Sequence, residues 1–235
     1  MRPVLGISRG NLNCNMPFLH SISQRLQIRL SSKPTPNSTS VTTSKSTSQP
    51  INKKSTMAAT PIVLILGSGP RVGAAVSETF AANGYKVAVA ARKGTNSKTD
   101  KGFLSIKADF TQPESVAAVF DAVKAEFGAA PGIVIYNAAA LTPPSDKESA
   151  LSIPAAKVTS DLNVNVVSPY VAAQEAIKGW ATLPAQAKKT FIYTGNIQNE
   201  AVLPVPMMLN LGVGKAASAY WVGLADGAYS AQGYR

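Results

Sequence analysis

Cysteine and histidine are almost missing from this sequence of 235 residues, and both occur near its start. Cys14 and His20 are the single residues of their kinds, and both precede Met57. Residues 57–235 therefore cannot hold a disulfide, a zinc finger, a cysteine nucleophile or a Ser-His-Asp triad. We expect no metal site there, and any catalytic proton must come from Tyr, Lys, Asp, Glu, Ser, Thr or water.

Acidic residues are also scarce, since the chain has 12 of them and the first is Glu78. Eight of the 23 basic residues precede Met57, so the formal net charge of +11 falls to +3 for residues 57–235. This mild excess, without a basic patch interleaved with aromatic residues, does not predict nucleic-acid binding. No apolar run approaches the length of a membrane span, so we expect no membrane segment.

Residues 1–56 do not have the composition of a folded domain, and we call them the leader. Residues 31–56 consist mostly of Ser, Thr, Pro, Asn and Lys, so we expect them to be disordered. Residues 17–30 place four apolar side chains at four-residue steps beside two arginines, as organelle import sequences do. Two interpretations stay open: a mitochondrial presequence, or an upstream extension of a cytoplasmic protein that begins at Met57. In both, residues 57–235 form the folded domain.

Residues 62–92 have the pattern of a strand, a glycine-rich turn, a helix and a second strand. Both apolar runs predict strands that are buried on two faces of a sheet. Such a βαβ unit, with glycines at its first turn, is typical of dinucleotide-binding domains. Its parts are a strand at 62–66, glycines at Gly67, Gly69 and Gly73, a helix at 74–82 and a strand at 86–91.

The chemistry of this unit indicates a phosphate-bearing ligand. Glycines let the backbone turn sharply and approach a pyrophosphate, while the following helix directs free N–H groups and its positive dipole end at the anion. The end of the second strand, where an acidic residue would hold a ribose 2′-OH, carries Arg92. A guanidinium binds a 2′-phosphate with two hydrogen bonds, so we expect NADP(H) rather than NAD(H). The alternative is that Arg92 merely solvates a strand end.

The remaining chain continues the alternation of strands and helices, which predicts a single α/β domain with a Rossmann-like, doubly wound parallel sheet of about five strands. Ligands of such sheets bind beyond the carboxyl ends of the strands, where Gly67–Gly73, Arg92, Asp109, Asn137 and Thr194 fall. The expected elements are strands at 102–108, 133–136 and 189–194, a polar loop at 95–101, and helices at about 111–127, 160–180 and 207–229.

On these motifs, residues 61–235 resemble the short-chain dehydrogenase/reductase family. Asp109 resembles the family's adenine-contacting aspartate, Asn137-Ala138-Ala139 its Asn-Ala-Gly, and Asn165 the helix asparagine of its proton relay. The family's Gly-x-x-x-Gly-x-Gly is matched in part, because Gly67 and Gly73 agree, Arg71 replaces the middle glycine and Gly69 is additional. The resemblance implies a cofactor site formed by Gly67, Gly69, Arg71, Val72, Gly73, Arg92, Asp109, Asn137 and Lys215.

The resemblance is incomplete at the catalytic signature, which in the family is Tyr-x-x-x-Lys. Lys215 matches its lysine, but Leu211 stands in the tyrosine position, and Thr194 to Asn196 replace the expected serine. Lys215 and Asn165 are the expected catalytic residues, with a solvated lysine and a water-bridging asparagine as alternatives. Tyr193, Thr194 and Tyr220 are substitute proton donors in principle, although each is more typical of a packing or strand-end residue.

Two functions follow from this pattern. The first is an NADP(H)-dependent oxidoreductase that acts on a small carbonyl or alcohol substrate, and the second is a catalytically inactive dinucleotide-binding regulatory or scaffold protein. The resemblance also implies a possible homodimer through the helices that carry Asn165 and Lys215. It further implies two more strands after Arg235, so we expect strand 189–194 to be an unprotected edge, either in a fragment or beneath a partner chain, and residues 57–235 alone to be poorly soluble.

Overall fold

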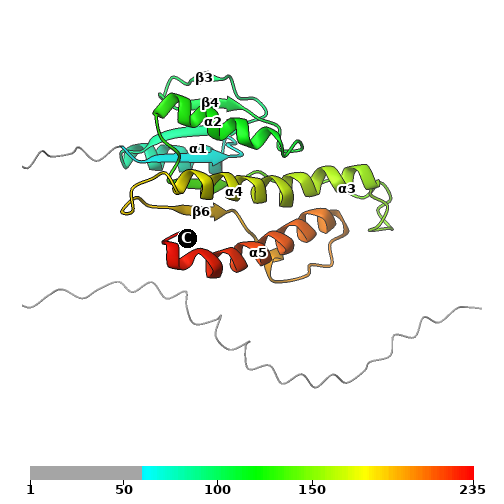
Figure 1. Ribbon diagram of the computed structural model, residues 1–235. Helices are drawn as coiled ribbons and strands as arrows, with labels where there is room; N and C mark the ends of the chain where they lie inside the picture. Colours follow the sequence, from blue (N-terminus) through cyan, green and yellow to red (C-terminus); the bar gives the residue numbers. More distant parts are fainter. Residues whose placement is uncertain (1–59) are drawn as a thin grey trace, which may run out of the picture. The chain divides into compact units, whose positions relative to one another are not determined.

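A six-stranded sheet forms the centre of the molecule in the computed structural model, which describes residues 60–235 (Figure 1). The predictions for the leader lie outside the described residues. The strand order is β3-β4-β2-β1-β5-β6, and every neighbouring pair is parallel except β3 with β4. The predicted doubly wound parallel sheet is therefore confirmed. The strands are β1 (Ile62–Leu66), β2 (Lys86–Ala91), β3 (Ser97–Lys98), β4 (Leu104–Lys107), β5 (Ile133–Tyr136) and β6 (Thr190–Tyr193).

The two-residue strand β3 was not predicted, because residues 95–101 are polar and were expected to be a loop. Here the chain turns back antiparallel onto the edge of β4. Asn96 adopts a left-handed φ of 54°, and its Oδ1 accepts a hydrogen bond from the N–H of Lys107 at 2.8 Å. Local side-chain bonding thus places a polar segment beside the sheet, which hydrophobic periodicity alone does not signal.

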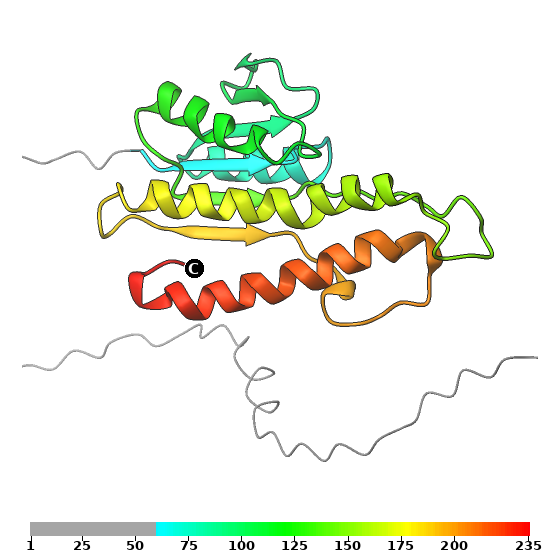
Figure 2. The ribbon, with the colours of Figure 1, turned by 45° about the vertical axis from the view of Figure 1, so that its right-hand side comes forward.

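Helices cover both faces of the sheet because the buried strands alternate their apolar side chains. Val63 and Ile65 of β1 pack towards Val76 and Phe80 of α1, whereas the opposite face packs against α2 and α4. Figure 2 shows α1 on one side of the sheet and α2 and α4 on the other. The helices are α1 (Val72–Ala82), α2 (Ser115–Phe127), α3 (Ala155–Leu162), α4 (Ser168–Trp180) and α5 (Leu209–Tyr229), with short helices at η2 (Ile197–Asn199), η3 (Pro206–Met208) and η4 (Ser230–Gln232).

The predicted helix at 160–180 is longer than expected and is interrupted. It consists of α3, a π-helical segment η1 (Asn163–Val167) and α4 in one continuous run. Asn165 lies within η1. Pro169, four residues later, has no N–H to donate to the carbonyl of Asn165, which is one reason why regular α-helical bonding fails here. The consequence for the site is described below.

Strand β6 lies at the edge of the sheet, as the sequence predicts. That edge is partly paired, however, because the N–H of Phe191 donates to the carbonyl of Arg235 at 2.7 Å and the N–H of Arg235 donates to the carbonyl of Lys189 at 3.0 Å. The expectation of an unprotected edge is thus wrong for the first half of the strand. No helix within residues 60–235 combines the length and apolar character that crossing a membrane requires.

Candidate active site

The first turn of the site joins β1 to α1 and brings its glycines into three different environments. Gly67 has a φ of +94°, and a Cβ added to it would lie 2.3 Å from the backbone nitrogen of Ala138. A Cβ on Gly73 would lie 2.5 Å from Cα of Ser68. A Cβ on Gly69 would meet no atom within 4 Å. Gly67 and Gly73 are therefore required by close packing, whereas Gly69 faces open space in which a ligand can approach the backbone.

The beginning of α1 has free hydrogen-bond donors. Arg71 occupies the N-cap position without a capping side-chain bond, and the first turn contains no acidic residue. The first N–H groups of a helix have no partner within the helix. That of Ala74 donates to the carbonyl of Gly69 at 3.0 Å, which leaves those of Val72 and Gly73 for an anion. Arg71 and Val72 are both exposed at this end. The expected cofactor residues of the turn thus lie where the helix dipole favours a phosphate.

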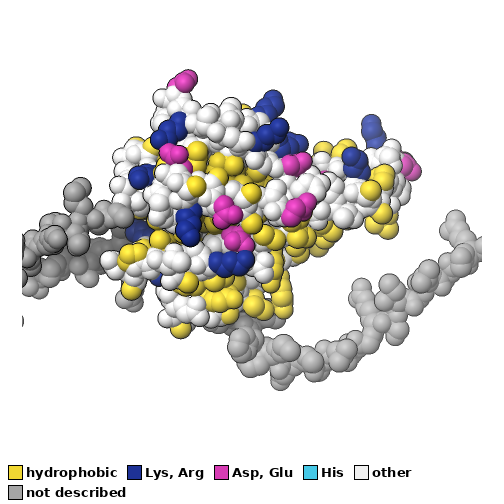
Figure 3. All heavy atoms as spheres, turned by 45° about the horizontal axis from the view of Figure 1, so that its top comes forward, with side chains coloured by type: hydrophobic (Ala, Val, Ile, Leu, Met, Phe, Trp, Pro, Cys, Tyr) yellow, Lys and Arg dark blue, Asp and Glu magenta, His cyan; other side chains and the backbone are white. Residues whose placement is uncertain are grey.

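Arg92 lies directly after β2, on the crest that we define as the carboxyl ends of the five parallel strands. Its side chain is exposed. None of the three ion pairs among residues 60–235 involves Arg71 or Arg92. Asp109 follows β4 at the same edge, and its Oδ1 accepts a hydrogen bond from the N–H of Thr111 at 3.0 Å. Figure 3 shows Lys and Arg side chains scattered over the visible face of the molecule, with Asp and Glu side chains among them.

Asn137, which follows β5, contacts the glycine turn rather than open solvent. Its Nδ2 donates to the carbonyl of Gly67 at 2.9 Å, so it ties the ends of β5 and β1 together. The segment that follows is held in turn by Asn165, which is fully buried. Oδ1 of Asn165 accepts from the N–H of Ala140 at 2.9 Å, and its Nδ2 donates to the carbonyl of Ala140 at 2.8 Å. This pairing uses the amide of Asn165 for positioning the crest.

The backbone carbonyls of η1 accept hydroxyl groups from three other elements. Tyr136 donates to Val164 at 2.7 Å, and both Tyr193 and Ser218 donate to Asn165, at 3.0 and 2.8 Å. These carbonyls are free because the π-helical turn and Pro169 remove their usual helical partners. Burial raises the pKa of both tyrosine hydroxyls. Tyr136 and Tyr193 are therefore firmly protonated groups whose hydrogens point at the backbone.

Lys215 is a buried residue of α5 and not a solvated helix lysine. Only 4% of its surface is exposed, and its Nζ donates to the carbonyl of Thr194 at 2.5 Å. The same Nζ lies 4.4 Å from the centre of the Tyr193 ring, which is a cation–π distance. Burial lowers the pKa of this ammonium group. α5 can approach η1 this closely because residue 214 is a glycine. A Cβ at this position would lie 2.4 Å from Cβ of Asn165.

Several kinds of contact thus connect the glycine turn to Lys215. Asn137 is hydrogen-bonded to Gly67, and Asn165 is hydrogen-bonded to Ala140, three residues after Asn137. Tyr193 in turn donates to the carbonyl of Asn165, and the ammonium of Lys215 lies over its ring. The sequence-predicted residues Asn137, Asn165, Thr194 and Lys215 are brought together at one end of the crest. Arg92 and Asp109 lie at its other end, and Tyr220, which is 76% exposed, lies outside it.

A buried carboxylate that the sequence analysis missed holds the segment after Asn137. Asp161 of α3 accepts from the N–H and the hydroxyl of Thr142, at 2.8 and 3.0 Å, and from Nδ2 of Asn210 at 3.0 Å. Asp161 and Asn210 are 5% and 3% exposed. Asp161 lies one helical turn before Asn165, on the same helical face, which is the sequence signal that indicates its inward direction. It joins α3, the crest and the start of α5.

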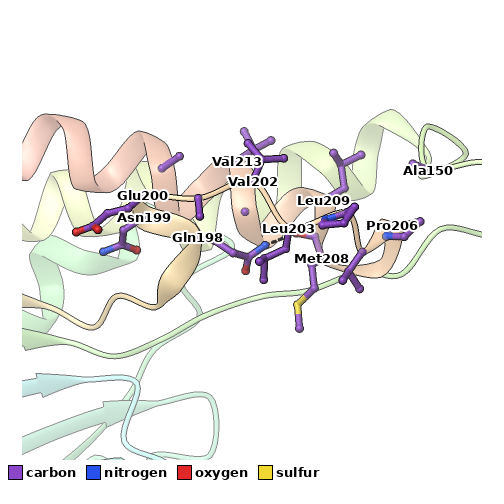
Figure 4. A pocket seen from close by; sticks show the side chains of 15 residues that line it. Ala150, Gln198, Asn199, Glu200, Val202, Leu203, Pro206, Met208, Leu209 and Val213 are labelled. Atoms are coloured by element: carbon purple, nitrogen blue, oxygen red, sulfur yellow. Dashed lines mark hydrogen bonds between the residues drawn. The ribbon is translucent and has the colours of Figure 1, made fainter.

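A large apolar groove lies beside α5, apart from Lys215. Its volume is about 580 Å³. Val202 and Leu203 of the loop after η2 line it together with Leu209 and Val213 of α5, and Figure 4 shows these side chains with the Gln198 amide among them. Leu209 and Val213 project from a different face of α5 than Lys215 does, by helical spacing. We therefore do not assign this groove to the nicotinamide end of the site.

The role of Asn165 leads to a stability prediction. Replacing Asn165 by Asp keeps the shape of the side chain but removes the donor to the carbonyl of Ala140 and places a charge where the residue is fully buried. We expect the free energy of unfolding to fall by about 2–4 kcal/mol at pH 7. Urea unfolding followed by circular dichroism measures this.

The matched control is Gln186→Glu, which also turns an amide into a carboxylate, since Gln186 is exposed in the loop before β6. This variant should stay within about 0.5 kcal/mol of the wild-type protein. An Asn165→Asp protein as stable as this control would contradict the positioning role of Asn165.

The fit of a dinucleotide rests on the open face at Gly69, the uncapped helix end and the exposed arginine at the crest. Within residues 60–235, no three His, Cys, Asp or Glu side chains gather in a way that could hold a metal ion.

Comparison with known proteins agrees with this geometry. A family model described as short chain dehydrogenase matches residues 61–193. The short chain dehydrogenase/reductase dmxR12 of Cryptosporiopsis sp. is 37% identical over 185 residues, which is 74% of this chain and 74% of that protein.

Two solved structures share the fold. A short chain dehydrogenase from Burkholderia cenocepacia in complex with NADP has a TM-score of 0.61 at 22% identity, over 74% of this chain and 70% of that one. An oxidoreductase of the short chain dehydrogenase/reductase family from Brucella ovis, with a partially ordered NAD, has a TM-score of 0.61 at 18% identity, over 75% of this chain and 80% of that one. The matched family model and the identity to the Cryptosporiopsis protein show that this chain belongs to the short-chain dehydrogenase/reductase family of oxidoreductases.

Proposed function

We propose that this chain is an NADP(H)-dependent oxidoreductase that interconverts a small carbonyl compound and an alcohol. The observation that carries the proposal is the crest itself. It combines an open glycine face and an uncapped helix end with an exposed arginine where NAD-binding members of such folds carry a carboxylate. The two structural neighbours contain NADP in one case and NAD in the other, so the arginine is the specific argument for NADP.

Each predicted residue has a role in this proposal. Gly69 and the N–H groups that begin α1 at Arg71, Val72 and Gly73 hold the pyrophosphate, while Gly67 shapes the turn beneath it. Arg92 binds the 2′-phosphate, and Asp109 contacts the adenine, a role that follows from the family resemblance. Asn137 fixes the turn through its hydrogen bond to the carbonyl of Gly67. When bound, the nicotinamide cofactor supplies or accepts the hydride.

At the other end of the crest, Lys215 binds the nicotinamide ribose, an assignment that follows from the family resemblance. Its Nζ has two N–H groups besides the one that bonds to Thr194. Asn165 acts through position, because its amide fixes Ala140 and its carbonyl fixes Tyr193 and Ser218. The small-molecule substrate then lies beside Lys215 at the crest.

Leu211 favours the second function, an inactive dinucleotide-binding regulatory or scaffold protein. Its side chain is half-buried one turn before Lys215 and has no proton to transfer. Titration of the full chain with NADPH, followed by cofactor fluorescence, and assay of NADPH oxidation with a panel of aldehydes and ketones separate the two. Binding with turnover supports the oxidoreductase, whereas binding without turnover on every carbonyl favours the inactive protein. Lack of binding would refute both.

We also propose a homodimer, for which the exposed apolar side chains of α4 and α5 provide the support. Tyr170 of α4 is 49% exposed, and Tyr220 and Leu224 of α5 are 76% and 62% exposed. Tyr170 contacts Trp221 edge-on, with ring centres 5.5 Å apart, which joins the two helices into one surface. Exposed apolar patches of this kind mark association surfaces.

We expect Leu224→Glu to convert a dimer into a monomer, because the interface would have to bury an unpaired carboxylate. Size-exclusion chromatography with light scattering gives the mass directly. Ser230→Glu is the control, since Ser230 is exposed beyond the end of α5. A wild-type protein that is monomeric at high micromolar concentration would refute the dimer, as would a Leu224→Glu protein that is still dimeric.

A further inference from the structure

We propose that Lys215 itself gives the proton to the substrate oxygen during carbonyl reduction, in the place of the tyrosine that Leu211 replaces. This inference rests on the proposed function. It follows from the hydrogen bonds that the nearby hydroxyl groups already make and from the contacts and burial of Lys215.

The tyrosine and serine hydroxyls near Lys215 are already committed to the backbone. Tyr136, Tyr193 and Ser218 all donate to carbonyls of η1 within 3.0 Å. Giving one of these protons away would leave a buried carbonyl of η1 without that donor, and burial already raises the pKa of the two tyrosines. Tyr220 projects outward and is 76% exposed. The hydroxyls are thus positioning groups.

The ammonium of Lys215, unlike these hydroxyl groups, keeps N–H bonds that no backbone carbonyl occupies. It has three N–H bonds, of which one is held by the carbonyl of Thr194, so two are left for the nicotinamide ribose and the substrate oxygen, and Nζ lies over the Tyr193 ring. None of the ion pairs in the described part of the chain includes Lys215. A buried cation without a carboxylate partner gains stability when it becomes a neutral amine, and burial accordingly lowers the pKa of this group. A lowered pKa makes this ammonium a better proton donor than an exposed lysine.

The reaction balances with groups already named. The carbonyl carbon receives a hydride from the reduced nicotinamide cofactor, and the carbonyl π electrons move to oxygen. The oxygen forms a bond to a proton from Nζ, whose N–H electrons remain on nitrogen. The products are the alcohol, the oxidised cofactor and a neutral amine, which takes a proton from water before the next turnover.

The ionisable groups around Lys215 are few and come from three elements. Tyr193 of β6 lies beneath the ammonium, and Tyr136 of β5 stacks behind that ring with centroids 6.1 Å apart. Asp161 of α3 reaches the same end of α5 through its bond to Asn210. Both tyrosines remain neutral through physiological pH, because their pKa values are raised. A loss of reduction rate with rising pH therefore reports on Lys215.

The test compares Lys215→Arg with the wild-type full chain. Arginine keeps the charge and the donors to Thr194 and a ribose but does not release its proton. We expect the variant still to bind NADPH in a fluorescence titration, and its reduction rate at saturating NADPH to be about 10²–10⁴-fold lower. The wild-type rate should fall as pH rises through the lysine pKa, and the variant should lose that dependence.

A second variant tests whether the Lys215→Arg protein is slow because it lacks a proton donor. We expect Leu211→Tyr in the Lys215→Arg background to recover at least tenfold of the lost rate, because it places a phenol one turn before residue 215. Independently, NMR titration of 13C-labelled lysine in the wild-type protein without cofactor should show one lysine that loses its proton well below the others.

The outcomes are distinct. A Lys215→Arg protein that reduces the substrate at the wild-type rate, or a Lys215 that titrates like an exposed lysine, would overturn this role and leave the proposed function standing. NADPH binding without turnover would overturn the role and the oxidoreductase function but leave the cofactor site. Failure to bind NADPH would overturn all of them.

Discussion

Replacing Gly67 by alanine should destabilise the folded chain strongly, whereas the same change at Gly69, two residues away, should leave the fold intact. At Gly67 the new Cβ meets backbone nitrogen and Cα of Ala138 at 2.3 and 2.5 Å, and the φ of +94° is unfavourable for any residue with a side chain. Strained backbone and overpacking together predict a loss of about 3–5 kcal/mol in the free energy of unfolding. That corresponds to a fall of roughly 10 °C in Tm for a domain of this size.

The Gly69→Ala variant is the matched partner of this experiment. Its Cβ meets nothing within 4 Å and its backbone is unstrained, so the free energy of unfolding should change by less than about 0.5 kcal/mol. The added methyl group points into the space assigned to the pyrophosphate, and we expect NADPH affinity to fall about tenfold or more. Thermal melts and cofactor fluorescence measure the two effects separately. A Gly69→Ala protein that binds NADPH like the wild type would contradict the placement of the cofactor on this turn.

The second large effect is expected at Arg92, which the proposal assigns to the 2′-phosphate. Arg92→Ala removes the charge-assisted hydrogen bonds of the guanidinium, which we expect to contribute about 1.5–3 kcal/mol in total at this exposed position. NADPH affinity should therefore fall about 10–150-fold, while NADH affinity should stay within about threefold because NADH has no 2′-phosphate. Raising the salt concentration should weaken NADPH binding more for the wild type than for the variant.

The control for Arg92 is Lys98→Ala. Lys98 lies on β3 and forms an ion pair with Glu126 at 2.8 Å, so it tests the effect of total charge without touching the assigned phosphate position. We expect its NADPH affinity to be close to that of the wild type. If Arg92→Ala reduced NADPH and NADH binding equally, the residue would be acting on something shared by both cofactors, and the preference for NADP would be wrong.

Local sequence patterns were sufficient to predict the parallel strands and the helices between them, because each of these elements carries its own signal. The apolar run of β1 and the glycines after it are contiguous, and β1 is buried along its whole length, as an unbroken apolar run predicts. The antiparallel β3 escaped prediction because its formation depends on Asn96 bonding to Lys107, eleven residues away. Hydrophobic periodicity contains no information about such a contact.

The site was harder to predict, because its contacts join distant parts of the chain. Asn165 was identified from its motif, but its partners Ala140, Tyr193 and Ser218 lie 25, 28 and 53 residues away. Pro169 was the available sign that the carbonyl of Asn165 lacks a helical donor. The burial of Lys215 depends on the close approach of α5 to η1 at Gly214, which spacing along one helix does not reveal.

The most direct test is a crystal structure of the chain grown with NADPH. The account predicts the cofactor along the crest, with its pyrophosphate at Gly69 and the start of α1 and its 2′-phosphate within hydrogen-bonding distance of Arg92. A crest without the cofactor at saturating NADPH, or a cofactor whose adenosine end lies away from Arg92, would contradict it.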